Sequence, residues 1–103
     1  MSVDKFAEYV VNNLCRATLA NAMNIADKLD NPDYYVFTEF NDFVIRYLGT
    51  LSVQQFLGNV KVCKMLYACY KASEAYNSNF KYNKRMIIDN YIIDLWNAIN
   101  KTT

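Results

Sequence analysis

The stretch Phe80-Lys81-Tyr82-Asn83-Lys84-Arg85-Met86-Ile87-Ile88-Asp89 decides the fold of this chain of 103 residues. Residues 80–82 and 85–88 have the composition of two brief strands, and Asn83-Lys84 between them suits a tight turn because Asn tolerates positive φ. A hairpin here predicts a two-stranded wing, and helix throughout from residue 80 is the competing interpretation. Asp89 is expected to cap a last helix, whose apolar residues recur at i, i+3 and i+4. These are Tyr91, Ile92, Leu95, Trp96 and Ile99.

Immediately upstream, the pattern predicts two short helices. Ser52 and Gln55 form a capping box, which predicts that a helix begins there and runs over about 51–57. Gly58-Asn59 follows, and a second helix is expected from residue 61 or 63 to residue 73. Two short helices joined by a Gly-containing turn are typical of a helix-turn-helix.

The first fifty residues predict a pair of helices. Apolar residues recur at helical spacing over residues 2–29, and Pro32 stops that helix because proline cannot continue the hydrogen-bond ladder. A second helix is expected from residue 34 or 38 to residue 48, with Gly49 as its C-terminal stop. Residues 1–50 are therefore expected to form a helical region, and 51–103 a winged helix-turn-helix region, within one unit.

Composition excludes several classes of function. The chain has no histidine, which removes Ser-His-Asp catalysis, Cys-His catalysis and histidine-based zinc sites. Cys15, Cys63 and Cys69 lack CxxC spacing, so they are expected to be reduced, buried thiols of a cytoplasmic protein without metal or cofactor. Gly49 and Gly58, the only glycines, make no phosphate-binding loop. We expect a protein that is not an enzyme, has no signal peptide and has no membrane span.

Three segments carry a resemblance to a known family: Ser52-Val53-Gln54-Gln55, then Val60-Lys61-Val62-Cys63-Lys64, then residues 80–89 continuing to Trp96. Over residues 51–98 the chain resembles the excisionase and MerR-like winged helix-turn-helix family, although Asn83 and Leu57 stand where that family prefers Gly and Ala. The resemblance implies a small DNA-binding protein, either a recombination factor or a transcription regulator of a phage or mobile element. It places the recognition helix in the major groove and the basic wing on the DNA backbone.

The charge distribution agrees with that interpretation independently of the resemblance. Residues 1–50 carry four Lys/Arg against seven Asp/Glu, a net −3, whereas residues 51–103 carry seven against three, a net +4. Clustered Lys and Arg attract phosphate whatever the whole-chain charge. The residues expected to contact DNA are Lys61, Lys64, Tyr67, Lys71, Lys81, Lys84 and Arg85.

A non-enzymatic helical interaction module or inhibitor, encoded by a phage or mobile element, is the alternative. Aromatic side chains anchor many protein interfaces. In this alternative an all-α four-helix bundle binds a protein partner through aromatic residues of the N-terminal half. Those residues are Tyr34, Tyr35, Phe37, Phe40 and Tyr47. In the DNA-binding interpretation, the N-terminal helices are expected to supply the surface for a homodimer or a protein partner. The helical content of residues 77–89 discriminates between the two interpretations, since a wing requires a hairpin there.

Overall fold

The structure, a computed structural model, describes residues 2–30, 36–53, 59–78 and 84–101. Within those ranges the chain forms five α-helices and no strand. The helices are α1 Val3–Leu14, α2 Leu19–Leu29, α3 Phe37–Val53, α4 Asn59–Asn77 and α5 Lys84–Asn100. The mainly α prediction is confirmed. The all-α alternative fits better than the winged one, with five helices in place of four.

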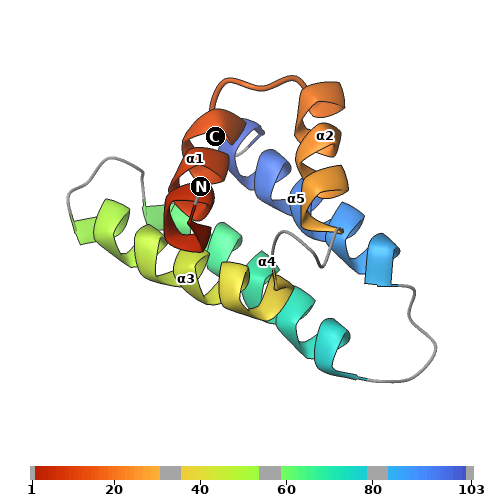
Figure 1. Cartoon of the computed structure of the whole chain (residues 1–103). Helices are drawn as coiled ribbons and strands as arrows, with labels where there is room; N and C mark the ends of the chain where they lie inside the picture. The colour runs from red at the N-terminus through yellow and green to blue at the C-terminus, as the bar shows by residue number, and fades with distance from the viewer. Residues whose placement is uncertain (1, 31–35, 54–58, 79–83, 102–103) are drawn as a thin grey trace.

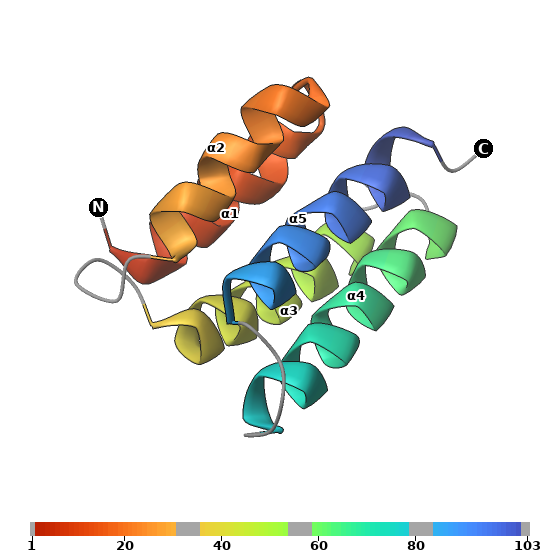
Figure 2. The same ribbon diagram turned by 90° about the vertical axis from the view of Figure 1, so that its right-hand side faces the viewer.

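The helices pack as a continuous series of neighbours that joins the two halves of the chain. α1 packs on α3, α3 on α4, α4 on α5 and α5 on α2. Figure 1 shows α5 between α2 and α4, and Figure 2 shows successive helices running in opposite directions. Because α5 contacts α2 and α1 as well as α4, one apolar core is shared by residues from both halves.

A connected set of aromatic rings lies in that core. Phe6 of α1 lies 5.5 Å from Phe40 of α3, measured between ring centroids, and Phe40 lies 6.4 Å from Tyr91 of α5. Phe37 contacts both Tyr91, at 5.1 Å, and Tyr76 of α4, at 4.8 Å. Offset and edge-on ring pairs add to the free energy gained by burying the apolar area. The rings therefore join four of the five helices near one end of the bundle.

The single N-terminal helix expected over residues 2–29 is two helices. α1 ends at Leu14, and Thr18 accepts a hydrogen bond from the backbone N–H of Asn21, at 3.2 Å, as the cap of α2. A threonine cap satisfies a backbone donor that a new helix start leaves unpaired. The predicted apolar stripe is nevertheless correct at Phe6, Val10 and Ile25, which are all buried.

Gly49 does not stop α3, and the capping box at Ser52 does not begin a helix. α3 continues through Gly49 to Val53, because Leu48 and Leu51 on its inner face are both buried in the core. Residues 51–53 are thus the last turn of α3 and not a separate short helix, while residues 54–58 lie outside the described part of the chain. The short first helix of the expected helix-turn-helix is absent from the described residues.

The helix expected from residue 61 or 63 to 73 is confirmed and is longer, since α4 spans Asn59–Asn77. One buried polar contact ties it to α3: the Asn41 side-chain amide donates to the Cys69 carbonyl, at 3.0 Å. The Asn41 amide oxygen is buried and has no hydrogen-bond partner among the described residues. A buried, partly satisfied amide costs stability, but it favours one register of α3 on α4.

The expected wing is wrong for the residues that the structure describes. Residues 84–89 belong to α5, so the expected strand over 85–88 is helical and Asp89 lies inside the helix instead of capping it. Ile87, Ile88 and Tyr91 are all buried, and a helix places residues at this spacing on one face. Residues 80–82, the other expected strand, are outside the described ranges.

Among the described residues, no helix is long and apolar enough to cross a bilayer.

Replacing Phe40 by alanine tests the aromatic core. Phe40 is fully buried, so Phe40→Ala is expected to lower the free energy of unfolding by about 3–5 kcal/mol. Urea denaturation followed by circular dichroism measures it. Tyr67→Ala, at an exposed position of α4, is the control and should cost less than about 0.5 kcal/mol. Equal costs for the two variants would contradict this description of the core.

Candidate functional site

The charged side chains separate along the axis of the bundle. Because the helices alternate in direction, the α1–α2 connection, the start of α4 and the last residues of α5 lie at one end, towards the upper right of Figure 2. The charged residues there are Arg16, Lys61, Lys64 and Lys101, and we call this set the cationic end. No Asp or Glu accompanies them: residues 9–26, 43–73 and 95–103 contain no carboxylate side chain.

The opposite end carries seven carboxylates and four cations among the described residues, a net −3. This acidic end consists of Asp4, Lys5, Asp27, Lys28, Asp30, Glu39, Asp42, Glu74, Lys84, Arg85 and Asp89. Glu8, Arg46, Lys71 and Asp94 lie in the central turns of their helices, and their charges cancel. The near-neutral chain is therefore a dipole from one end of the bundle to the other.

Specific hydrogen bonds assemble the cationic end. The Trp96 indole donates to the Ala17 carbonyl, at 2.7 Å, and the Asn100 amide donates to the Leu14 carbonyl, at 3.0 Å. Both bonds hold the α1–α2 connection against the last turns of α5, which brings Arg16 and Lys101 to the same end of the molecule. The Lys101 ammonium also lies 5.7 Å from the centre of the Trp96 ring, a cation–π contact.

The start of α4 joins the same end. Burial raises the pKa of the Cys15 thiol, and the positive charges of Lys61 and Arg16 oppose that rise. Lys64, about one turn further along α4, shares a surface groove with Lys101. Two cations of α4, and two that follow the C-terminal ends of α1 and α5, thus lie at one end of the bundle without a carboxylate among them.

Helix electrostatics do not explain this arrangement. Positive side chains stabilise the C-terminal end of a helix and destabilise its N-terminal end, by about 0.3–1 kcal/mol each. Arg16 and Lys101 follow the C-terminal ends of α1 and α5, where they are favourable, but Lys61 and Lys64 lie in the first two turns of α4. Asp27 and Asp30 likewise lie at the unfavourable C-terminal end of α2. The charges follow the end of the bundle and not the dipole of each helix.

The structure divides the residues expected to contact DNA. Lys61, Lys64, Tyr67 and Lys71 lie along α4, and Tyr67 is 67% exposed. Lys84 belongs to the acidic end, where its ammonium contacts the Tyr76 carbonyl and ring. Lys81 lies outside the described residues. On α4, Lys64, Tyr67 and Lys71 are therefore exposed and Lys61 is half-buried, and the described wing residues are not part of this surface.

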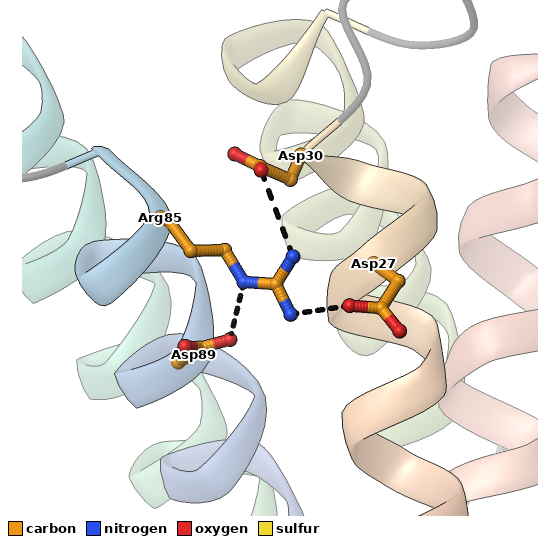
Figure 3. A network of polar contacts seen from close by, with 4 residues as sticks. All are labelled: Asp27, Asp30, Arg85 and Asp89. Atoms are coloured by element: carbon orange, nitrogen blue, oxygen red, sulfur yellow. Dashed lines mark hydrogen bonds and ion pairs between the residues drawn. The ribbon is translucent and has the colours of Figure 1, made fainter.

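Arg85 faces α2 and is engaged by carboxylates (Figure 3). Its guanidinium lies 2.5 Å from Asp27, 2.9 Å from Asp89 and 3.6 Å from Asp30. The hydrogen bond to Asp27 is the largest cause of a raised pKa for Arg85. Arg85 is therefore a structural link between α5 and α2, which corrects its expected role on a DNA-binding wing.

The expected protein-docking surface is also corrected. Phe37 and Phe40 are only 2% and 0% exposed, because both belong to the ring cluster of the core. Tyr47 is half-buried, and its hydroxyl donates to the Asn12 side chain, at 3.0 Å. Tyr34 and Tyr35 lie outside the described residues. Aromatics at helical spacing on this segment form the core and not an exposed aromatic face.

A groove of about 540 Å³ runs between α4 and α5 beside the cationic end. Lys64 and Tyr67 of α4 and Asn97 and Lys101 of α5 line it, with Ala68 and Ala98 among its lining residues. The Lys71 ammonium and the Asp94 carboxylate, 2.9 Å apart, also line this groove. Beyond that pair, the space between α4 and α5 continues as a second hollow.

Sequence reasoning missed Arg16, Lys101 and Asn97 as members of one surface. Arg16 lies in the half of the chain that is acidic as a whole, so a division at residue 50 assigns it to the wrong surface. The available signal is the position of the carboxylates along the chain, which are absent from residues 9–26, 43–73 and 95–103. Among the described residues, no group of three His, Cys, Asp or Glu side chains could hold a metal ion.

Comparison of the chain with protein-family models, with curated proteins and with solved structures finds no match.

Removing the Arg85 side chain should destabilise the bundle without affecting the cationic end. Arg85→Ala leaves Asp27, Asp30 and Asp89 close together without their shared cation. The network is partly exposed, so we expect a cost of about 1 kcal/mol, decreasing as salt screens the remaining carboxylates. Urea denaturation at low and high salt measures the difference. A cost that is absent at low salt, or that grows with salt, would contradict the network's role.

Thiol reactivity tests the burial of Cys69. Its side chain is buried, and burial raises its pKa to about 12. Cys15 and Cys63 are exposed, which corrects the expectation that all three thiols are buried. The thiolate is the reactive form, so at mildly alkaline pH alkylation of the folded protein should label Cys15 and Cys63 and spare Cys69. Mass spectrometry after labelling, with the urea-unfolded protein as the control, counts the adducts. Rapid labelling of Cys69 in the folded protein would contradict the structure.

Proposed function

We propose that this protein binds DNA through its cationic end. The observation that carries the proposal is that Arg16, Lys61, Lys64 and Lys101 lie at one end of the bundle, where no Asp or Glu of the described residues accompanies them, although Lys61 stands in the unfavourable first turn of α4. A duplex presents a dense line of phosphate charge, and cations that neutralise phosphates release condensed counterions. A surface of this kind gains most of its affinity from that release.

The acidic end supports the same assignment by exclusion. Its net charge of −3 repels phosphate, so one end of the bundle is attracted to a nucleic acid and the other is turned away from it. Long-range attraction of the cationic end would also orient the dipolar molecule before contact. The orientation of binding follows from the fold, although the whole chain carries only +1.

The expected mode is backbone contact with α4 as the element nearest the DNA. Lys61 and Lys64 lie on α4, and Arg16 and Lys101 approach from the ends of α1 and α5. Contacts to phosphate position a protein on DNA, while sequence is read by contacts to base edges. The proposal therefore concerns affinity for DNA in general, through contacts to phosphate.

The resemblance to the winged helix-turn-helix family does not carry this proposal. A wing needs a hairpin, and residues 84–89 of this chain are helical. A role as a recombination factor or transcription regulator is a further proposal, which requires that the protein binds DNA. The assignment of the cationic end to DNA depends neither on that role nor on the resemblance.

Matched triple substitutions test the proposal. Lys61→Ala/Lys64→Ala/Lys101→Ala removes three charges from the cationic end, and Lys5→Ala/Lys28→Ala/Lys84→Ala removes three from the acidic end. The first variant should lose at least about tenfold in affinity for a mixed-sequence duplex at about 50 mM salt, and the second should change less than about twofold. Fluorescence anisotropy with a labelled duplex measures both.

The dependence on salt gives a second readout from the same titrations. With four phosphate contacts, the wild-type slope of log affinity against log salt should be about −3 to −4, and the cationic-end variant should lose most of it. Equal losses in both variants would mean that net charge alone attracts DNA. Absence of binding by the wild-type protein at low salt would overturn the proposal and favour a helical module for a protein partner.

A further inference from the structure

The groove between α4 and α5 has features that backbone contact to a duplex does not use. Its volume of about 540 Å³ lies within the roughly 300–1,000 Å³ of small-molecule sites. Ala68 and Ala98, both buried, contribute short apolar side chains from the two facing helices. Small side chains on facing helices leave a shallow, apolar space beside the cationic end.

The groove also presents an aromatic ring and an amide. Tyr67 is 67% exposed, and its ring centre lies 5.4 Å from the Lys71 ammonium. The hydrogen bond and ion pair between Lys71 and Asp94 raise the pKa of Lys71. Lys71 therefore stays charged beside the ring. Asn97 lines the α5 side and supplies one donor and one acceptor group.

The charged groups of the groove favour an anion where Lys64 and Lys101 line it. Lys64, Lys71 and Lys101 line it together with one carboxylate, that of Asp94, which Lys71 neutralises. Lys64 and Lys101 belong to the cationic end, so the groove is continuous with the surface assigned to DNA. The apolar space with its ring and amide suits a base, and the two lysines suit the adjoining phosphates.

We propose that this groove binds one unpaired nucleotide of a nucleic acid strand, with the base against Tyr67 and the alanines and the adjoining phosphates near Lys64 and Lys101. The inference rests on the proposed function and assigns it a preference for single-stranded segments. The faces of bases in a duplex are stacked on one another, whereas the faces of unpaired bases are open to stack on aromatic rings. The Asn97 amide then lies where a base edge can exchange hydrogen bonds with it.

Tyr67 and Tyr70 provide a matched pair for the test. Both are exposed tyrosines of α4, at 67% and 59%, but only Tyr67 lines the groove. Tyr67→Ala should weaken binding of a labelled single-stranded oligonucleotide by roughly 5- to 100-fold, and Tyr70→Ala by less than about twofold. Affinity for a blunt duplex should change little in either variant. Circular dichroism checks that both variants keep their helices.

The outcomes separate this inference from the proposed function. If the wild-type protein binds the duplex and the single strand, but Tyr67→Ala and Tyr70→Ala behave alike, the groove assignment is overturned and the cationic end stands. If the wild-type protein binds neither, both are overturned. Binding of a free mononucleotide as tightly as the oligonucleotide would overturn the assignment to a strand.

Alkylation of Cys63, which lines the groove, gives a readout that is independent of affinity. A short oligonucleotide should slow its reaction with iodoacetamide in the wild-type protein and in Tyr70→Ala. The same concentration should protect it much less in Tyr67→Ala. Undiminished labelling of Cys63 in a saturated wild-type complex would contradict occupancy of the groove.

Discussion

The contact between aromatic rings from α1, α3, α4 and α5 is the constraint from which the rest of this molecule follows. Phe37 and Phe40 present two rings from successive turns of α3 to Tyr91, and each continues to a further ring, Tyr76 or Phe6. Tyr91 is 1% exposed, and its hydroxyl lies 3.7 Å from the Cys69 sulfur. Burial raises the pKa of Tyr91 well above its ordinary value, so the ring stays neutral in the core. These ring contacts hold the N-terminal parts of α1, α3 and α5 beside the C-terminal part of α4.

The distribution of charge follows from that packing. Each helix carries its carboxylates towards one end, and the alternating directions bring those ends together. Arg85 stabilises the acidic end by bridging Asp27, Asp30 and Asp89, while Trp96 and Asn100 hold the other end together by donating to backbone carbonyls. One end is thus closed by ion pairs and the other by neutral hydrogen bonds. The neutral bonds do not engage the cations of that end, of which Arg16, Lys64 and Lys101 are exposed and Lys61 is half-buried.

Local pattern predicted the helices well where burial and propensity agree, and failed where they conflict. The stripes of α1 and α2 and most of α4 could be read from the sequence because their apolar residues recur at helical spacing. Gly49 and the capping box at Ser52 are local signals that the burial of Leu48 and Leu51 outweighs. The four residues Arg85-Met86-Ile87-Ile88, taken alone, are compatible with either a strand or a helix. The continuation to Tyr91, Ile92 and Leu95 shows the helical period. The cationic end was half predictable: Lys61 and Lys64 stand in the basic half, but Arg16 reaches them only through the fold.

The central claim is that charge sorted by the direction of the helices makes one end of this bundle a surface for DNA. The most direct measurement is a nuclear magnetic resonance titration of the isotope-labelled protein with a short duplex at low salt, following the backbone amide signals. We expect the shifted signals to cluster at Arg16, Lys61, Lys64 and Lys101, and those of Lys28, Lys84 and Arg85 to stay in place. Shifts that cluster at the acidic end instead, or that spread evenly over both ends, would contradict it.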